Sequence, residues 1–194
     1  MSLAFDPIAH RYTYDGVEVP SVTSILTGVG ISDYSRIPRD VLARAAARGT
    51  AVHEAIEYLL ADDLDWSSVA DEIEPYVSAY VEWVRDTGWQ PVQIECRLYH
   101  PTLRYAGTAD QIGTLGGEMY VLDLKTSARP AEWWAIQTMA YRECLPDREV
   151  RRGALRLGRD GRAQFIPHDR DARDRGVWHA AVTVHHWRGA HNGA

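Results

Sequence analysis

GTADQIGTLGGEMYVLDLK, residues 107–125, is the stretch on which the fold of this chain depends. It predicts two antiparallel strands joined by a turn at its paired glycines, Gly116 and Gly117. The first strand is expected to end near Asp110. The second, Met119–Lys125, is an apolar run that carries an acid and a base near its end. The stretch therefore predicts a hairpin whose second strand takes charged side chains into an apolar setting.

The acid and the base of the second strand are two residues apart. Residues at that spacing in a strand point to the same face, so Asp123 and Lys125 are expected side by side, with Leu124 on the opposite face. Burying such charges costs several kcal/mol unless they are paired or bound to a metal ion. Two explanations stay open from these residues alone: a chemical site, or a fraying strand end whose charges reach water.

Size and composition restrict the class of protein. A chain of 194 residues, with 45% hydrophobic and 25% charged residues, suits a single domain over residues 1–194. Its net charge of −6 argues against a general nucleic-acid coat protein, because phosphate binding relies on Lys and Arg. An enzyme that meets phosphate through a metal ion is not excluded. We expect no membrane segment and a cytoplasmic location, because no apolar run is long enough to cross a bilayer and no signal peptide is recognisable.

The rest of the chain alternates between helical and extended patterns. Strands are expected over His10–Tyr14, Val17–Pro20, Val92–Leu98, Tyr105–Ile112, Met119–Lys125, Arg151–Leu157 and Arg162–Ile166. Helices are expected over Val22–Leu26, Pro38–Leu60, Ser67 or Ser68 to about Asp86, Ala131 to about Leu145, and Asp171 or Asp174 to about Trp187. This order predicts an α/β (α+β) architecture with a central mixed sheet.

The hairpin also brings two carboxylates together. Asp110 and Asp123 are expected to lie near each other across the strands, and converging carboxylates suit Mg²⁺ or Mn²⁺, which prefer oxygen ligands. Lys125 beside them can hold or deprotonate a metal-bound water. The combination fits hydrolysis of a phosphodiester, in which the metal polarises the phosphoryl oxygen and lowers the pKa of water.

Two further features lie on helices. Gln137 and Tyr141 are four residues apart and share a helical face, where they can reach a phosphate or a base edge; a half-buried tyrosine beside an amide is the ordinary alternative. His53 has Glu57 one turn later, so the zinc-protease pattern H-E-x-x-H fails at its last position. Taken alone, His53 fits a surface histidine or a hydrogen-bonded core histidine.

Taken together and in order, these residues resemble the RecB-like nucleases of the PD-(D/E)XK superfamily. The series is His53, Glu95, Gly107-x-x-Asp110, Asp123-x-Lys125 and Gln137-x-x-x-Tyr141. The segment VPSVTSIL, residues 19–26, also resembles the start of phage-type and mitochondrial-type exonucleases of that group. The resemblance covers about residues 10–145, whereas the expected hairpin and helix at about 150–188 match no motif. It implies a restriction-endonuclease-like fold, with a central mixed sheet flanked by helices.

The resemblance also implies roles for single residues. Metal ligands would be His53, Asp110, Asp123 and the backbone carbonyl of Leu124, binding Mg²⁺ or Mn²⁺. Lys125 would activate or orient the water, and Glu95 would orient a metal-bound water. Gln137 and Tyr141 would position the DNA strand near the scissile phosphate. No iron–sulfur cluster is expected, because the chain has two cysteines, Cys96 and Cys144, and such clusters in related nucleases take four.

The implied activity is that of a metal-dependent DNA exonuclease, acting on single strands or duplex ends in replication, recombination or repair, with a phage origin suggested by the resemblance. Two alternatives stay open: a structure-specific endonuclease on the same site, and a non-catalytic DNA-binding subunit with a nuclease fold. Three groups have less certain meaning. They are four tryptophans that either stack on bases or pack in the core (Trp83, Trp89, Trp133, Trp134), an arginine cluster between Arg148 and Arg162 that fits a solvated hairpin face, and three C-terminal histidines (His179, His185, His186).

Overall fold

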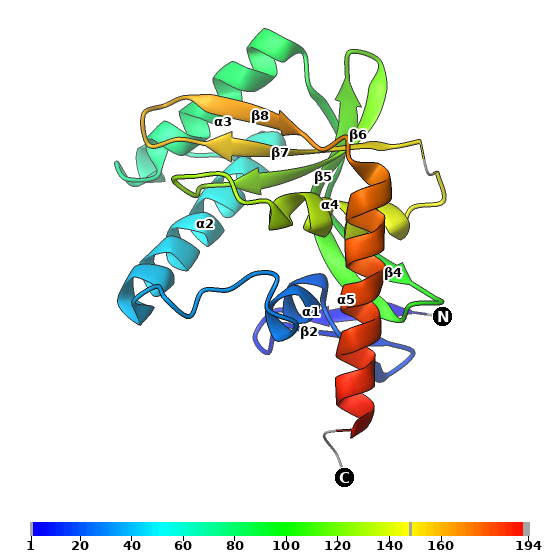
Figure 1. The fold of residues 1–194 in the computed structure, drawn as a ribbon. Helices are drawn as coiled ribbons and strands as arrows, with labels where there is room; N and C mark the ends of the chain where they lie inside the picture. Colours follow the sequence, from blue (N-terminus) through cyan, green and yellow to red (C-terminus); the bar gives the residue numbers. More distant parts are fainter. Residues whose placement is uncertain (1, 148, 192–194) are drawn as a thin grey trace.

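The chain folds around a five-stranded sheet. A computed structural model describes residues 2–147 and 149–191 (Figure 1). The strands are β4 (Gln90–His100), β5 (Tyr105–Leu115), β6 (Glu118–Lys125), β7 (Arg151–Leu157) and β8 (Ala163–Pro167), in that order across the sheet. β6 and β7 are parallel and the other neighbours are antiparallel, so the predicted mixed sheet is confirmed.

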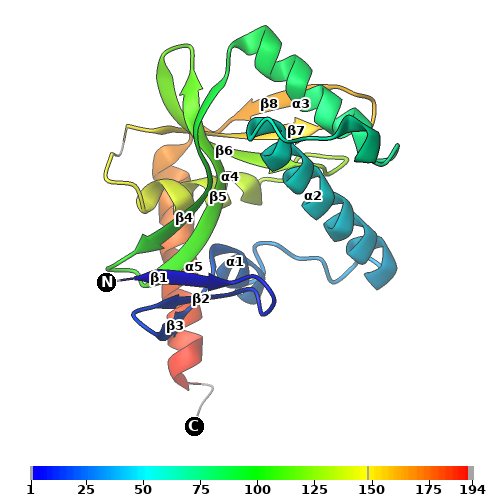
Figure 2. The same ribbon diagram turned by 180° about the vertical axis from the view of Figure 1, so that it is seen from behind.

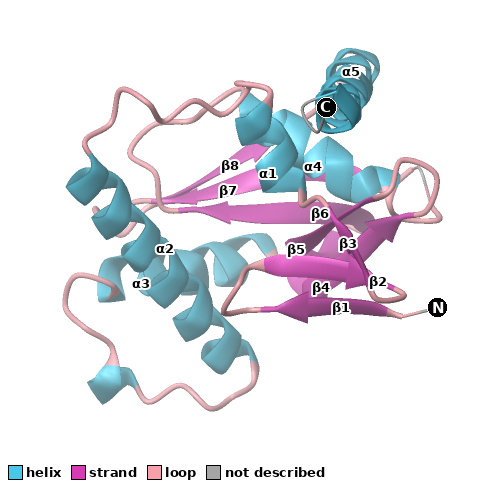
Figure 3. Cartoon of the chain, turned by 90° about the horizontal axis from the view of Figure 1, so that it is seen from below, coloured by secondary structure: helices cyan, strands magenta, loops and turns pink. Residues whose placement is uncertain are grey.

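Helices cover both faces of this sheet, as Figure 3 shows from below. On one face, α2 (Arg39–Leu60) and α3 (Glu74–Thr87) enclose a core with the even-numbered residues of β6, Tyr120 and Leu122 among them. On the other face, α1 (Val22–Gly28), α4 (Trp133–Glu143) and α5 (Asp171–His191) form a second core. The sheet is therefore buried on both faces, which explains why its central strands read as nearly continuous apolar runs.

A second, smaller sheet lies beside β4 and β5 of the large sheet. It contains β1 (Leu3–Asp6), β2 (Arg11–Tyr14) and β3 (Val17–Val19), all antiparallel (Figure 2). Its rings dock on the large sheet: Tyr14 stacks on Tyr99 at 3.8 Å, and the hydroxyl of Tyr12 lies 2.7 Å from that of Thr108. β1 was not among the expected strands. This sheet holds the start of α1 against β5.

Two expected boundaries were wrong. Ser67 and Ser68 belong to a short 3₁₀ turn, Trp66–Ser68, whose cap is the Asp65 carboxylate accepting from the amide of Ser67. α3 begins later, at Glu74, with Pro75 in its first turn where a missing N–H costs nothing. β5 also continues to Leu115 instead of ending near Asp110, so Asp110 lies within a strand.

The arginine cluster is not uniformly a solvated face. Arg152 is fully buried and reaches Asp171 at 2.7 Å and Asp174 at 2.9 Å, both at the start of α5. It also donates to the carbonyl of Ala135 in α4. Arg148 lies outside the described residues. A buried ion pair thus ties β7, α4 and α5 together. None of the helices that the structure describes is both long and apolar enough to cross a lipid bilayer.

Candidate active site

The site forms where β5 and β6 part. Their pairing ends with Gln111 opposite Leu122, and continuing this register would put Asp110 opposite Asp123. Instead of bonding to a backbone carbonyl of β5, the amide of Leu124 donates to Oδ2 of Asp110 at 2.6 Å. The Asp110 side chain therefore fills the opening between the two strands and satisfies an amide that the ladder leaves free.

Three acceptor groups from three elements meet on the α2 side of this opening. His53 comes from α2, Glu95 from β4 and Asp110 from β5. One atom of each residue that could bind a metal ion lies within 4.8 Å of the other two. Nδ1 of His53 is 3.7 Å from Oδ1 of Asp110 and 4.0 Å from Oε1 of Glu95. We call His53, Glu95 and Asp110 the acceptor cluster. Among the described residues it is the one such grouping of histidine, cysteine and acidic side chains.

The other nitrogen of the His53 ring faces the backbone. Nε2 lies 3.3 Å from the carbonyl oxygen of Leu124. With its proton on Nε2, the ring donates to that carbonyl, and Nδ1 then turns an unshared electron pair toward the two carboxylates. Metal-binding histidines commonly have their tautomer fixed in this way by a backbone carbonyl. The direct role of the Leu124 carbonyl as a metal ligand stays a prediction.

The closeness of Glu95 to Asp110 has two unfavourable features, a left-handed backbone conformation and the crowding of two carboxylates. The register of β4 and β5 puts the two residues opposite each other, and Glu95 has a backbone φ of 48°, in the left-handed region that few residues other than glycine adopt. Burial and the charge of Asp110 raise the pKa of the Glu95 carboxyl to about 7. Such a strained conformation and such crowding of like charges are typical of functional sites.

Asp123 and Lys125 lie side by side, as their spacing predicted, and they are on the α4 side of the opening. Nζ of Lys125 is 2.6 Å from Oδ2 of Asp123, whose side chain is 1% exposed. Burial raises the pKa of Asp123, and the negative charge of Asp110 adds to this, although the ammonium opposes both. Among the described residues, Oδ2 of Asp123 accepts no hydrogen bond of regular geometry. The ion pair with Lys125 alone therefore compensates the charge of this buried oxygen.

Two polar residues of α4, Gln137 and Tyr141, extend this ion pair into a chain of hydrogen bonds. Lys125 donates to Oε1 of Gln137 at 2.9 Å, and Nε2 of Gln137 donates to the hydroxyl of Tyr141 at 2.8 Å. Asp123, Lys125, Gln137 and Tyr141 are called the lysine chain below. Both Gln137 and Tyr141 are buried, so the predicted shared face of α4 points at Lys125. Whether these two residues contact DNA stays a prediction.

The glycine of the G-x-x-D pattern has a packing reason. A Cβ built on Gly107 would lie 2.8 Å from Cε1 of Tyr141 and 3.0 Å from Cγ2 of Val22. The Tyr141 ring therefore rests on bare backbone of β5, which sets the depth of α4 against the sheet. Gly107 positions Tyr141 and has no chemistry of its own.

The four tryptophans divide into two classes. Trp83, Trp89 and Trp134 are at most 8% exposed and belong to the core, so the stacking hypothesis is wrong for them. Trp133 is only half-buried, and its ring centroid lies 5.1 Å from Nζ of Lys125, a cation–π contact. The sequence contained no signal that could single out Trp133 from its neighbour, since both lie at the start of one helix.

The C-terminal histidines have partners of other kinds. His179 lies 3.3 Å from a carboxylate oxygen of Glu143, and His186 lies 3.0 Å from the carbonyl of Leu103. They do not form a metal-binding group within the part of the chain that the structure describes.

The acceptor cluster fits a divalent ion. Ligands on opposite sides of an octahedral Mg²⁺, each at about 2.1 Å, are about 4.2 Å apart, and neighbouring ligands are closer. The separations of 3.7 and 4.0 Å from Nδ1 of His53 lie inside that span. One nitrogen and two carboxylates suit Mn²⁺ or Mg²⁺. The structure brings Glu95 together with His53 and Asp110, while Asp123 is paired with Lys125; ligation by Asp123 stays a prediction.

Known proteins give a limited comparison. No protein-family model and no curated protein matches the chain. A crystal structure of LHK-Exo in complex with dAMP shares 17% sequence identity at a TM-score of 0.41, over 75% of this chain and 80% of that chain. The alkaline exonuclease LHK-Exo from Laribacter hongkongensis also matches in a second crystal structure, at 16% identity and a TM-score of 0.37, over 77% of this chain and 88% of that chain. Both crystal structures are of the same protein, LHK-Exo.

Proposed function

We propose that this chain is a divalent-metal-dependent DNA exonuclease that hydrolyses phosphodiester bonds on single strands or at duplex ends. One observation carries the proposal: an acceptor cluster suited to Mg²⁺ or Mn²⁺ shares the opening between β5 and β6 with a partly buried ammonium. Asp110 belongs to the cluster, and its Oδ2 accepts from the amide of Leu124, the residue between Asp123 and Lys125.

His53, Glu95 and Asp110 would hold the ion, with Asp123 and the Leu124 carbonyl completing the set. A bound divalent ion supplies Lewis-acid polarisation of the phosphoryl oxygen and a lower pKa for water. The chain's own residues would orient and stabilise. Of the three N–H groups of the Lys125 ammonium, one meets Asp123 and one meets Gln137, which leaves a third for the negative charge that grows on the phosphate.

Burial strengthens this contribution. The Lys125 side chain is 15% exposed, so its charge acts in a partly dry cleft where it is worth more than in water. Gln137 and Tyr141 keep the ammonium from turning away, because each hydrogen bond in the chain fixes the next. The intact set of Asp110, Asp123 and Lys125 favours an enzyme over a non-catalytic subunit, for which damage to the set is expected.

The test is cleavage of three DNA substrates by the purified protein with Mn²⁺: a single strand, a linear duplex and a covalently closed circle. We expect mononucleotides from the first two and an intact circle. Cutting of the circle would favour the endonuclease alternative, because a closed circle has no end. An absence of cleavage of every substrate, with either Mn²⁺ or Mg²⁺, would overturn the enzymatic proposal. Asp123→Asn, prepared in parallel, controls for a contaminating nuclease.

A further inference from the structure

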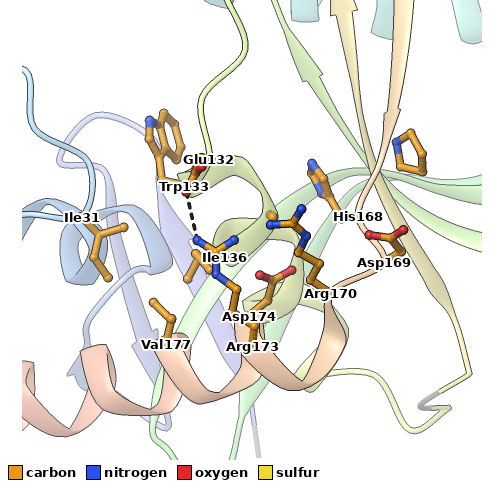
Figure 4. A pocket seen from close by; sticks show the side chains of 12 residues that line it. Ile31, Glu132, Trp133, Ile136, His168, Asp169, Arg170, Arg173, Asp174 and Val177 are labelled. Carbon is orange, nitrogen blue, oxygen red and sulfur yellow. Dashed lines mark hydrogen bonds and ion pairs between the residues drawn. The ribbon is translucent and has the colours of Figure 1, made fainter.

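A separate cavity lies behind Trp133, between the start of α4 and the start of α5. It has a volume of about 520 Å³, within the range of about 300–1,000 Å³ usual for small-molecule sites. Ile31, Ile136 and Val177 form an apolar floor and Trp133 forms one wall (Figure 4). No residue of the acceptor cluster or the lysine chain lines it. The cavity is thus distinct from the proposed metal site but shares the Trp133 ring with Lys125.

Both hydrogen-bond donors and hydrogen-bond acceptors surround this apolar floor. Figure 4 shows the guanidinium groups of Arg170 and Arg173 directed into the cavity, with Glu132 and Asp169 beside them. Arg173 pairs with Glu132 at 2.9 Å in an exposed contact, which a ligand can replace at little cost. Arg170 has no ion pair or hydrogen bond through its side chain to any residue that the structure describes.

The charged side chains around the cavity nearly cancel one another. This balance indicates which class of ligand the cavity can bind. Asp174 also lines the cavity, but it is neutralised by the buried Arg152 at 2.9 Å. Two arginines then face Glu132 and Asp169. Burial and the charge of Arg152 lower the pKa of His168 to about 4, so this ring adds no charge near neutral pH. A free phosphate dianion would find no excess of positive charge here, whereas a flat, uncharged ring with donors and acceptors on its edge would be matched.

We propose that this cavity binds one unpaired nucleobase of the DNA strand, stacked on Trp133 with its edge toward Arg170 and Arg173. Arginine pairs with acceptors on a base edge, carboxylates accept from exocyclic amines, and an indole stacks on any base. This inference rests on the proposed function in one respect, that DNA is the substrate. It adds that the enzyme holds a base outside the duplex stack, one ring away from the catalytic ammonium.

The experiment measures binding in the absence of metal, so that cleavage plays no part. Fluorescence anisotropy gives the Kd of the full chain in EDTA for a labelled single strand and for a set of strands that each lack one base. We expect the Kd to rise at one position only, by about 5- to 150-fold, the range that loss of one stacked base gives. Equal losses at every position, or no binding of the intact strand, would overturn the proposal.

Matched variants connect that position to the cavity. Val177→Phe fills the floor and leaves both arginines in place, so the intact strand should bind as weakly as the strand that lacks the critical base, and the two changes should not add. Val184→Phe, seven residues later in α5 and outside the cavity, should bind like the wild type. A Val177→Phe variant with unchanged Kd would overturn the proposal.

A substitution at an exposed residue, Arg170, keeps the test valid even where Val177→Phe fails to fold. Arg170→Ala should weaken binding of the intact strand by roughly 5-fold, as expected for one lost hydrogen bond, and leave the strand without the critical base unaffected. Equal weakening of both strands would mean that Arg170 only attracts the backbone, and the base pocket would be wrong. A chain that binds in this pattern but cuts nothing with Mn²⁺ would keep the pocket and lose the nuclease, so the two failures are distinguishable.

Discussion

The acceptor cluster and the lysine chain meet at the same opening in the sheet, yet they are built in opposite ways. In the cluster, one imidazole nitrogen faces two carboxylates, and one of the three residues has a left-handed backbone. In the lysine chain, Lys125 pairs with Asp123 and donates a hydrogen bond to Gln137, and Gln137 donates a hydrogen bond to Tyr141. We expect the first group to gain stability from a bound cation, whereas the opposite charges of the second are already paired within the protein.

The difference separates two kinds of variant. A change at Lys125, Gln137 or Tyr141 should alter turnover and leave ion binding in place. A change in the acceptor cluster should alter ion binding first, and through it the stability of the whole protein.

The largest effect is expected for Lys125. Lys125→Met or Lys125→Ala removes the ammonium that faces the growing charge of the phosphate, and kcat should fall by about 10²- to 10³-fold, as for other single transition-state donors. Asp123→Ala should also lower turnover, because it removes both the ion-pair partner of Lys125 and a proposed ligand of the metal ion. Single-turnover cleavage with Mn²⁺ gives the rate, and circular dichroism verifies the fold. Near-wild-type cleavage by a folded variant would mean that the residue is not catalytic.

Asp110 provides the contrasting variant. At an ion concentration of 100 times Kd, binding stabilises the native state by about 2.7 kcal/mol, roughly 5–11 °C in Tm for a chain of this size. Wild-type protein and Gln137→Leu should both show this rise with Mn²⁺, and Asp110→Asn should not. A full rise in Asp110→Asn would place the ion elsewhere and remove the distinction between the two groups.

The pH dependence of the metal-free protein tests the crowding at Glu95. Its folded pKa of about 7 lies above the ordinary 4.5, so between these values the folded state holds a proton that the unfolded state has released. Stability from this group is therefore present below about pH 4.5 and is lost as the pH rises through about 7. Urea unfolding in EDTA at pH 5 and pH 8 should show a smaller loss for Glu95→Gln than for wild type. An equal loss in both proteins would mean that Glu95 is not crowded.

The smallest effect concerns the end of the lysine chain. Tyr141→Phe keeps the ring against Gly107 but removes the hydroxyl that accepts from Gln137. One net hydrogen bond is worth about 1 kcal/mol, so kcat should fall by roughly 5-fold while the Mn²⁺ midpoint is unchanged. A shifted midpoint would show that Tyr141 acts on the ion, and the two groups would then not be separable.

What could be predicted followed from local spacing. The two-residue period of a strand put Asp123 beside Lys125, and the four-residue spacing of a helix put Gln137 on the face of Tyr141. The mixed sheet followed from the order of the patterns, and the helices on both of its faces from the family resemblance. The two side-chain inferences need only geometry within one element.

What could not be predicted depends on contacts between elements. β1 has four residues and is held by its pairing with β2, which no local pattern records. Ser67 gave a helix-start signal that a 3₁₀ turn used instead, because Asp65 caps it first. The place of Glu95 in the acceptor cluster arises from the register of β4 on β5 and a left-handed backbone, and neither can be read from one residue type.

The buried Arg152 has a consequence for how the polypeptide is made. A nascent chain that has emerged as far as residue 150 already contains every residue of the acceptor cluster and the lysine chain. It still lacks β7, the parallel neighbour of β6, and also Asp171 and Asp174, which neutralise the guanidinium that anchors α4. Under the proposed function, cleavage of DNA should therefore become possible only late in translation, after α5 has been made.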